Sequence, residues 1–275
     1  MAEAWTSWEV CKMSRKSRIF QNLFIILVFL FLYVPIFMVV IFSFNTSKMN
    51  IVWEGFTVQW YGTFFQNRPL MEALGLSLFI AVVSTAVSTV IGTLGAIGLN
   101  RFEFRGKNLV DQLLYIPVVI PEVVLGVALL CIFSALNMEL GITTITLSHI
   151  TFCIPFVVMN VRARVAGFDK SLEEAAQDLG ANGIITFFRI TLPLIMPGVM
   201  SGALLSFSLS LDDVIISFFV TGPGSTTLPL KILSMVKTGV TPEVNALSTI
   251  IMFVIMIGIS VKAGVQVKQL KKVHV

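Results

Sequence analysis

Three carboxylates lie in stretches of sequence that are otherwise apolar enough to enter a membrane. Glu122 follows Pro121 in one such stretch, and Asp212 and Asp213 are adjacent in another. A charged side chain at the centre of a membrane helix costs about 2.5–3.5 kcal/mol on the insertion scale, so these acids are expected to have a function. Carboxylates in an apolar pathway offset the lost hydration of ammonium groups. The three acids therefore predict a pathway that accepts an organic cation.

The stretch that contains the paired acids has one small and polar face. At helical spacing this face carries Gly202, Ser206, Ser210, Asp213 and Ser217. We expect Ser206, Ser210 and Asp213 to line a cavity or a subunit seam on this face. Asp212 is turned by about 100° from Asp213, so it is the second candidate for the pathway.

The elements that position these residues must be membrane helices. The chain has 275 residues, of which 56% are apolar and 12% charged, and its mean hydropathy is +0.92, which leaves too little polar surface for a soluble protein. A helix needs on the order of 20 apolar residues to cross a bilayer. Six runs are long enough, and they lie at 20–44, 72–99, 110–136, 143–164, 195–219 and 244–265. We predict an all-α integral membrane protein with six transmembrane helices.

This prediction divides the chain into a segment 1–19, a membrane domain 20–265 and a tail 266–275. Fifteen of the nineteen basic residues fall on one side of the six predicted spans. The positive-inside rule then places both termini in the cytoplasm, together with the loop at about 165–194. The net charge of +4 is spread over four sites next to the membrane, so it indicates orientation, and no nucleic-acid partner is expected.

The third predicted span contains Pro117 and Pro121, each of which removes a backbone hydrogen bond. We expect kinks there, with the freed carbonyl groups facing protein or a water-filled cavity. In the outer loop before the second span, Trp53, Trp60 and Tyr61 could stack on a cation. An interfacial aromatic belt is the stronger interpretation of these three residues.

Catalytic and metal-binding motifs are not expected in this chain. The cysteines Cys11, Cys131 and Cys153 are scattered, and no phosphate-binding loop is present. His149 and His274 do not suggest a Ser–His–Asp arrangement or a metal site. We therefore expect no catalytic residue, no bound metal and no cofactor on this chain, and any ATP hydrolysis must occur on a partner.

The polar stretch from 171 to 193 carries the pattern E-A-A, three residues, Gly, nine residues and I-x-L-P. The residues of the pattern are Glu174, Ala175, Ala176, Gly180, Ile190, Leu192 and Pro193. Ser171 and Glu174 predict a capping box that starts a helix, and Gly180 predicts a left-handed stop. Leu172, Ala175, Ala176 and Leu179 share one face of that helix. A second short helix is expected over 182–190, ended by Pro193.

All seven positions match the spacing of the EAA loop of ABC importer permeases, which the segment resembles. The segments 147–158, 172–181, 206–223 and 227–249 look very like the PotC-type permease family of bacterial spermidine/putrescine importers. The resemblance implies a type I ABC importer permease in the bacterial inner membrane, whose EAA loop docks on an ATPase. It also implies two copies of that ATP-binding subunit, loaded with Mg-ATP, a second homologous permease and an extracytoplasmic polyamine-binding protein. The family pattern also has an acidic residue after a proline in the third span, here Glu122, and a pair of aspartates, here Asp212 and Asp213.

Three alternatives stay open at this stage. A permease for ferric iron or an oxyanion would share the EAA loop, although anions fit poorly with three acids in the spans. A secondary transporter could use Asp212 or Asp213 as a proton or sodium site. A membrane scaffold that transports nothing would not need acids in its spans.

Overall fold

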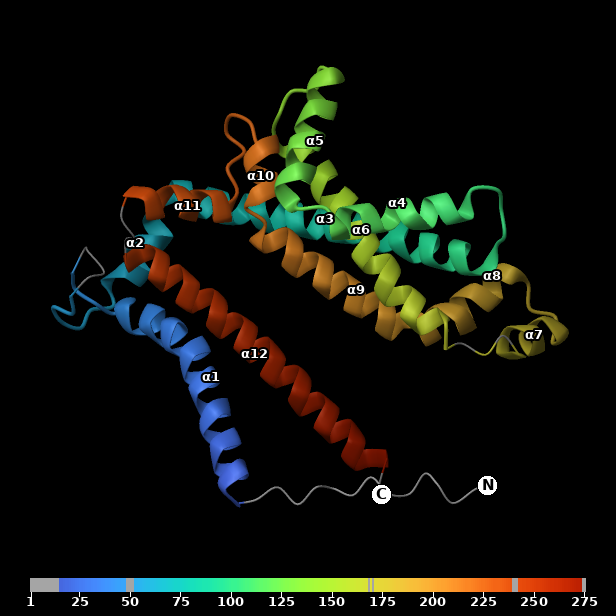
Figure 1. Cartoon of the computed structure of the whole chain (residues 1–275), viewed down its shortest axis with the longest axis horizontal. Coiled ribbons are helices and arrows are strands. Elements are labelled where there is room, and N and C mark those ends of the chain that lie inside the picture. Colours follow the sequence, from blue (N-terminus) through green and yellow to red (C-terminus); the bar gives the residue numbers. More distant parts are fainter. Residues whose placement is uncertain (1–14, 48–51, 168, 170, 239–241, 274–275) are drawn as a thin grey trace. The chain divides into compact units, whose positions relative to one another are not determined.

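The computed structural model describes residues 15–47, 52–167, 169, 171–238 and 242–273. Within these ranges the chain is helical, and an isolated β-bridge joins Asn45 and Phe56. The all-α prediction is confirmed. The chain forms two compact units, one from residues 1–66 with 239–275 and the other from residues 67–238 (Figure 1).

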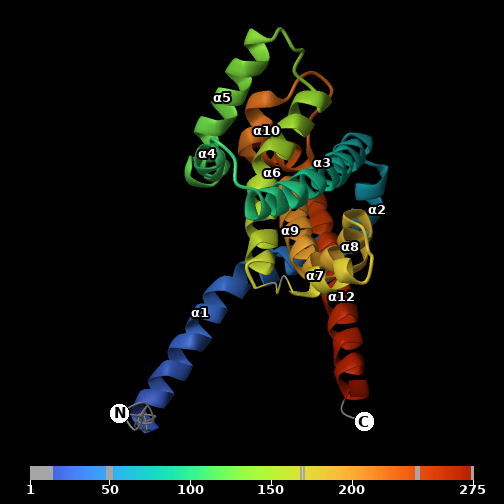
Figure 2. The ribbon, with the colours of Figure 1, turned by 90° about the vertical axis from the view of Figure 1, so that its right-hand side faces the viewer.

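The first unit contains α1 (Arg15–Phe42), α2 (Gln59–Gln66) and α12 (Pro242–Val273). Within this unit α1 begins and α12 ends on the same side (Figure 2). The apolar segment Phe20–Phe42 of α1 is long enough to cross a membrane, and the unit buries none of it. Its side chains are therefore available to lipid or to another membrane subunit.

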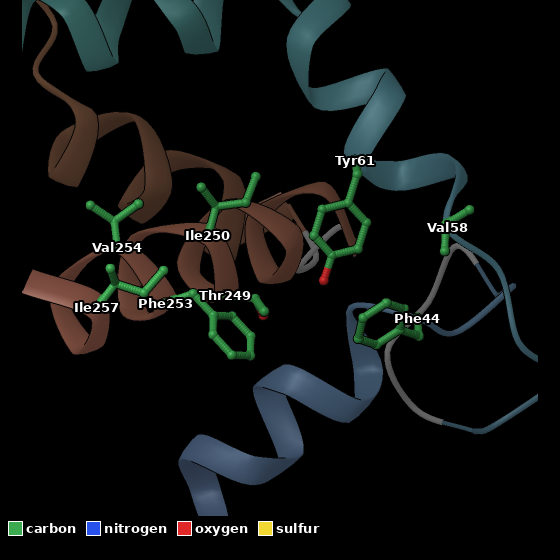
Figure 3. Close-up of a pocket in the computed structure, with 8 residues that line it drawn as sticks. All are labelled: Phe44, Val58, Tyr61, Thr249, Ile250, Phe253, Val254 and Ile257. Carbon is green, nitrogen blue, oxygen red and sulfur yellow. The ribbon is translucent and has the colours of Figure 1, made fainter. Parts of the chain in front are cut away.

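The loop between α1 and α2 is organised by Asn45. Its side-chain amide donates to the Val52 carbonyl over 2.7 Å, and its own carbonyl accepts from the Trp60 indole N–H over 2.6 Å. Trp60 is buried, and the Tyr61 hydroxyl lies 2.8 Å from the Ser43 hydroxyl. Trp60 therefore has a packing role, and of the three aromatic residues considered for cation stacking Trp53 alone is largely exposed. Tyr61 also borders an open apolar pocket of about 450 Å³, formed with α12 residues such as Phe253 (Figure 3).

The second unit is built around three long helices, α3 (Arg68–Arg101), α6 (Ile142–Val165) and α9 (Leu192–Asp212). Small residues of α3 are buried where it meets the other two, among them Ser77, Ala81, Ser84, Ser88 and Gly92. Gly92 of α3 and Gly202 of α9 both lie against Val157 of α6. A Cβ atom at position 92 would collide with the Val157 side chain, and one at position 202 would lie 3.0 Å from the Val157 Cα, which is tighter than ordinary contact. The small residues allow the helices to approach closely.

The third predicted span is broken into α4 (Lys107–Val119) and α5 (Glu122–Ala135), which meet at an angle of 114°. Pro117 lies within α4, so the main break is at Pro121 alone. Proline disfavours the helical conformation of the residue before it, and Ile120 is accordingly extended, with φ −72° and ψ 137°. Asp111 of α4 accepts two hydrogen bonds from the Arg162 guanidinium of α6, over 2.6 and 3.3 Å.

The prediction that Pro193 ends a short helix is wrong. The short α8 (Gly183–Thr186) passes through a π-helical turn, η1 (Phe187–Thr191), directly into α9, and Pro193 lies in the first turn of α9. A proline ring clashes with the carbonyl of the residue four positions earlier in an α-helix. The wider π-helical turn lies where that clash would occur, so the helix continues through it.

The fifth predicted span also ends earlier than expected. α9 stops at Asp212, Asp213 is extended, and the short α10 (Ile215–Val220) follows. Four helices of the described residues are long and apolar enough to cross a membrane, or five if α4 and α5 count as one broken span. In α12 the part with described side chains, Pro242–Ile257, is a shorter apolar helix. The remaining helix is α11 (Leu228–Thr238), whose first amide donates to the Ser77 hydroxyl over 2.7 Å.

Candidate functional site

The predicted coupling helix is present as α7 (Ser171–Asp178). Its first turn is capped by Asp169, whose carboxylate accepts from the Ser171 amide over 3.0 Å and whose carbonyl accepts from the Leu172 amide over 3.3 Å. The backbone N–H of Ser171 holds the pKa of Asp169 below its ordinary value. Asp169 replaces the predicted capping box of Ser171 and Glu174, because the helix begins closer to Asp169 than the S-x-x-E pattern indicates.

The end of α7 is as predicted. Gly180 has a φ of +88°, and its amide donates to the Gln177 carbonyl over 2.8 Å. The Ala181 amide donates to the Ala176 carbonyl over 3.0 Å, which completes the turn. Glycine is the residue that adopts this left-handed conformation at no steric cost.

The two glutamates at the start of α7 differ in environment. The Glu173 side chain is 13% exposed and pairs with the guanidinium of Arg101, the last residue of α3. The Thr191 hydroxyl of η1 donates to the same Glu173 oxygen, and it lies 3.2 Å from the Arg101 guanidinium. Glu174 is exposed, as is Ala175. Glu173 therefore attaches α7 to the long helices, while Glu174 faces outward.

The apolar face predicted for α7 is mostly uncovered. Ala176 is buried, but Leu172 is 48% exposed and Leu179 is 90% exposed. Leucine side chains exposed to this extent beside a charged residue are typical of a surface that binds a partner. The other residues of the motif have structural positions, because Ile190 lies in η1 and Leu192 packs at the start of α9 against the core residues of α3 and α6. Pro193 is exposed.

The three predicted acids occupy two helix breaks of the second unit. Glu122 is exposed at the first residue of α5, directly after the Pro121 break. Asp212 is exposed at the last residue of α9, whereas Asp213 is 8% exposed. Ser206 and Ser210 are buried as well. Of the three predicted acids, therefore, Glu122 and Asp212 reach the surface of the unit, and the predicted polar face of α9 is packed against its neighbours.

Asp213 joins α9 to α10 through hydrogen bonds to the backbone. Its two carboxylate oxygens accept from the amides of Ile216 over 3.2 Å and Ser217 over 2.8 Å. The Nε2 atom of His149 in α6 lies 3.3 Å from one of these oxygens and 3.0 Å from the Ser217 hydroxyl. The other ring nitrogen of His149, Nδ1, lies 2.7 Å from the Ser210 hydroxyl.

This cluster corrects the expectation that no Ser–His–Asp arrangement is formed. A catalytic triad uses one ring nitrogen of histidine for the serine and the other for the aspartate, as His149 does with Ser210 and Asp213. Ser210 is 4% exposed, however, and its hydroxyl also lies 3.0 Å from the Ser84 hydroxyl, so no substrate carbonyl can reach it. The cluster is a structural polar network. The sequence offered one sign of it, since histidine inside an apolar span is rare and usually paired.

Two comparisons place the chain among transport proteins. It is 46% identical over 235 residues to the spermidine/putrescine transport system permease protein PotC of Escherichia coli K12, with 86% of this chain and 89% of that protein aligned. It is also 46% identical over 235 residues to the putrescine transport system permease protein PotI of the same strain, over 83% and 84% of the two chains.

Solved structures share the fold. A chain of a bacterial ABC transporter involved in the import of the acidic polysaccharide alginate superimposes with a TM-score of 0.67 over 92% of this chain and 98% of that chain, at 16% identity. Residues 88–270 match the family described as the binding-protein-dependent transport system inner membrane component. This match and the relatives at 46% identity show that the chain belongs to that family of multi-pass membrane permeases.

Proposed function

We propose that this chain and a second, related permease form the membrane pathway of an ATP-driven importer for polyamines such as spermidine and putrescine. The observation that carries the proposal is the exposure of two carboxylates, Glu122 and Asp212, each at a break in an otherwise apolar helix. Neither carboxylate has an ion-pair partner among the described residues. An exposed acid beside an open backbone turn can bind an ammonium group that has lost part of its water.

The names of the relatives support this substrate class. PotC and PotI are described as spermidine/putrescine and putrescine permeases, and both substrates are organic polycations. Along α5, α6 and α9, the described arginines and lysines are Arg162 and Arg164, and Arg162 is paired with Asp111. The histidine of α6, His149, is buried beside Asp213. The charge of the exposed helix breaks is thus negative, which favours a cation over an oxyanion.

We propose that α7 docks on the ATP-binding subunit through Leu172, Glu174, Ala175 and Leu179. These side chains are exposed, and a helix with exposed apolar side chains suits a groove on a partner. Closure of two ATP-bound subunits would then move α7, and with it the long helices, between outward-facing and inward-facing states. Polyamine drives this change only if it binds the two states with different affinity.

The proposed assembly contains this chain, the second permease, two ATP-binding subunits that hydrolyse Mg-ATP, and an extracytoplasmic polyamine-binding protein. The permease pair would lie in the bacterial inner membrane with both termini of this chain in the cytoplasm. The excess of basic residues beside the predicted cytoplasmic ends of the spans supports that orientation. On the first unit, α1 begins and α12 ends on the same side, in agreement with an even number of crossings (Figure 2).

Uptake by the reconstituted complex tests the proposal. Proteoliposomes that contain both permeases and the ATP-binding subunits would be supplied with the binding protein and with labelled spermidine, putrescine, ferric iron or phosphate. ATP-dependent accumulation of a polyamine, and of neither of the other solutes, is the expected result. Accumulation of iron or phosphate in place of polyamine would contradict the proposed substrate. Accumulation that a proton or sodium gradient drives without ATP would favour a secondary transporter.

A further inference from the structure

One assignment of protons satisfies every hydrogen bond around His149. The Ser84 hydroxyl is 2.6 Å from the carbonyl oxygen of Ile80, which can only accept, so Ser84 donates there. The Ser84 oxygen is then an acceptor for the Ser210 hydroxyl, 3.0 Å away. Once Ser210 donates to Ser84, its own oxygen accepts from Nδ1 of His149 over 2.7 Å. The Nδ1 atom of His149 therefore carries a proton.

The second ring nitrogen faces an acceptor as well. Nε2 of His149 lies 3.3 Å from the Asp213 carboxylate and 3.0 Å from the Ser217 hydroxyl. The Ser217 hydroxyl is itself hydrogen-bonded to that carboxylate, to which it must donate, so its oxygen is an acceptor for Nε2. That carboxylate accepts from the backbone amides of Ile216 and Ser217, as an ionised acid does. A neutral ring that carries its single proton on Nδ1 would direct the lone pair of Nε2 at the lone pairs of the carboxylate. A proton on Nε2 removes this conflict and gives an imidazolium paired with a carboxylate.

The pair is enclosed by the second unit. The side chain of His149 is 1% exposed and that of Asp213 is 3% exposed. A buried charge is tolerated when it is paired and hydrogen-bonded, and here each charge balances the other. The pair also links three elements, because His149 belongs to α6, Ser210 to α9, and Asp213 caps the amides that begin α10.

We propose that His149 is a positioning residue: as a buried imidazolium it balances the charge of Asp213, and the pair fixes the break between α9 and α10. The role of this break in transport rests on the proposed function, in which the exposed carboxylate of Asp212, next to Asp213, binds polyamine. A break held at Asp213 determines where the carboxylate of Asp212 is presented. The carboxylate of Asp213 already accepts from two backbone amides and faces the imidazolium, so Asp213 positions the helix break and makes no contact with polyamine.

Nitrogen-15 NMR of labelled histidine tests the ion pair directly. The chain has two histidines, so a His274→Gln background leaves His149 as its one imidazole. Spectra are recorded for the His274→Gln complex and for the His274→Gln/His149→Gln complex. Their difference contains the signals of the His149 ring alone, even when the partner chains are also labelled. Two protonated ring nitrogens at neutral pH are expected, with hydrogen-bonded shifts that change in Asp213→Asn. A bare, unprotonated nitrogen would overturn the proposal.

A double-mutant cycle on uptake tests the positioning role. His149→Gln and Asp213→Asn each leave one buried charge without its partner, and each should lower the rate of polyamine uptake by about tenfold or more. The double variant His149→Gln/Asp213→Asn has neither charge, and its rate should return to within about threefold of the wild type, with an unchanged KM. His274→Gln alone is the matched histidine control.

The other outcomes of the cycle contradict the proposal. Losses that multiply in the double variant would mean that the two residues act independently. A double variant as poor as Asp213→Asn, with a raised KM for polyamine, would mean that Asp213 binds the substrate. Co-purification with the ATP-binding subunit identifies variants that do not assemble, and for these the NMR result decides. If the wild-type complex takes up no polyamine, the proposed function fails while the NMR experiment still tests the ion pair.

Discussion

The guanidinium of Arg101 and the carboxylate of Glu173 form an ion pair that joins the end of α3 to α7, the proposed coupling helix. The Thr191 hydroxyl donates to the same carboxylate from the π-helical turn that leads into α9. α9 has 21 residues and so is about 30 Å long. α7 and α10 lie at opposite ends of it (Figure 1). α9 therefore connects the end of the unit that contacts α7 with the break at Asp212 as one continuous helix.

Loss of the Arg101–Glu173 pair should weaken this connection. Glu173→Gln removes hydrogen bonds to a charged group, which are worth about 1.5–3 kcal/mol each. We expect polyamine uptake per ATP hydrolysed to fall by about tenfold, corresponding to about 1.4 kcal/mol of lost coupling. Parallel measurements of uptake and phosphate release in proteoliposomes give this ratio.

The Arg101→Gln variant and the double variant complete that experiment. If the two side chains act as a pair, Arg101→Gln lowers the ratio similarly and the double variant is no worse than either single variant. Independent, multiplicative losses would show that Glu173 and Arg101 act separately.

The neighbouring glutamate should behave differently, because Glu174 faces outward. Glu174→Lys reverses a charge on the proposed docking surface without disturbing the contacts of Glu173. We expect the permease to fold and insert normally while ATP hydrolysis no longer drives uptake. Thermal unfolding of the purified permease checks the fold, and uptake with co-purification of the ATP-binding subunit checks the docking. An assembled Glu174→Lys complex with normal uptake would refute the assigned docking surface.

The close packing of α3 and α6 gives a stability prediction with a control on the same helix. A Cβ atom at position 92 would lie 2.7 Å from the Val157 Cβ, whereas one at position 95 would lie no closer than 3.9 Å to its nearest neighbour. Gly92→Ala should reduce the free energy of unfolding by about 1–3 kcal/mol through overpacking. Gly95→Ala should be neutral or slightly stabilising, because alanine favours the helix. Denaturation in detergent measures both, and equal effects would contradict the described contact.

The cap of α7 should depend on pH in a defined direction. The folded-state pKa of Asp169 is lowered, so its cap is fully present above the unfolded pKa and is lost as the pH falls through the folded value. Amide hydrogen exchange at Ser171, whose N–H donates to the carboxylate, should therefore keep its protection, after correction for intrinsic rates, from neutral pH down to the ordinary aspartate pKa of 3.8, and lose it at lower pH. In Asp169→Asn, which keeps an acceptor oxygen but does not titrate, this loss should be absent. A similar acid-induced loss in both proteins would exclude Asp169 as its cause.

Local sequence patterns predicted the parts of the fold that local chemistry determines. Gly180 was expected to end α7, and it does so because a left-handed turn favours glycine. Small residues lie at helical spacing along α3, a pattern that lets membrane helices pack closely, and Ser84 and Gly92 are buried against other helices. The break at Pro121 followed from the covalent structure of proline, although the bend of 114° was larger than the expected kink.

The sequence could not predict features that depend on distant residues. The break after Asp212 is capped by Asp213, whose charge is balanced by His149, more than sixty residues earlier. Asp213 was expected to line the pathway ahead of Asp212, but Asp213 is enclosed and Asp212 is exposed. A carboxylate with a buried cationic partner can be enclosed while its neighbour stays exposed. Pro193 appeared to end a helix, since nothing in its neighbourhood signals the π-helical turn that accommodates it.

The most direct test of the account is the ATPase activity of the reconstituted complex with its binding protein, measured against putrescine, spermidine, ferric iron and phosphate. We expect stimulation by a polyamine alone. Asp212→Asn and Glu122→Gln should each reduce it by raising the polyamine concentration required, because each removes an exposed carboxylate. Stimulation by iron or phosphate, or polyamine stimulation that neither variant changes, would contradict the account of these acids as the polyamine pathway.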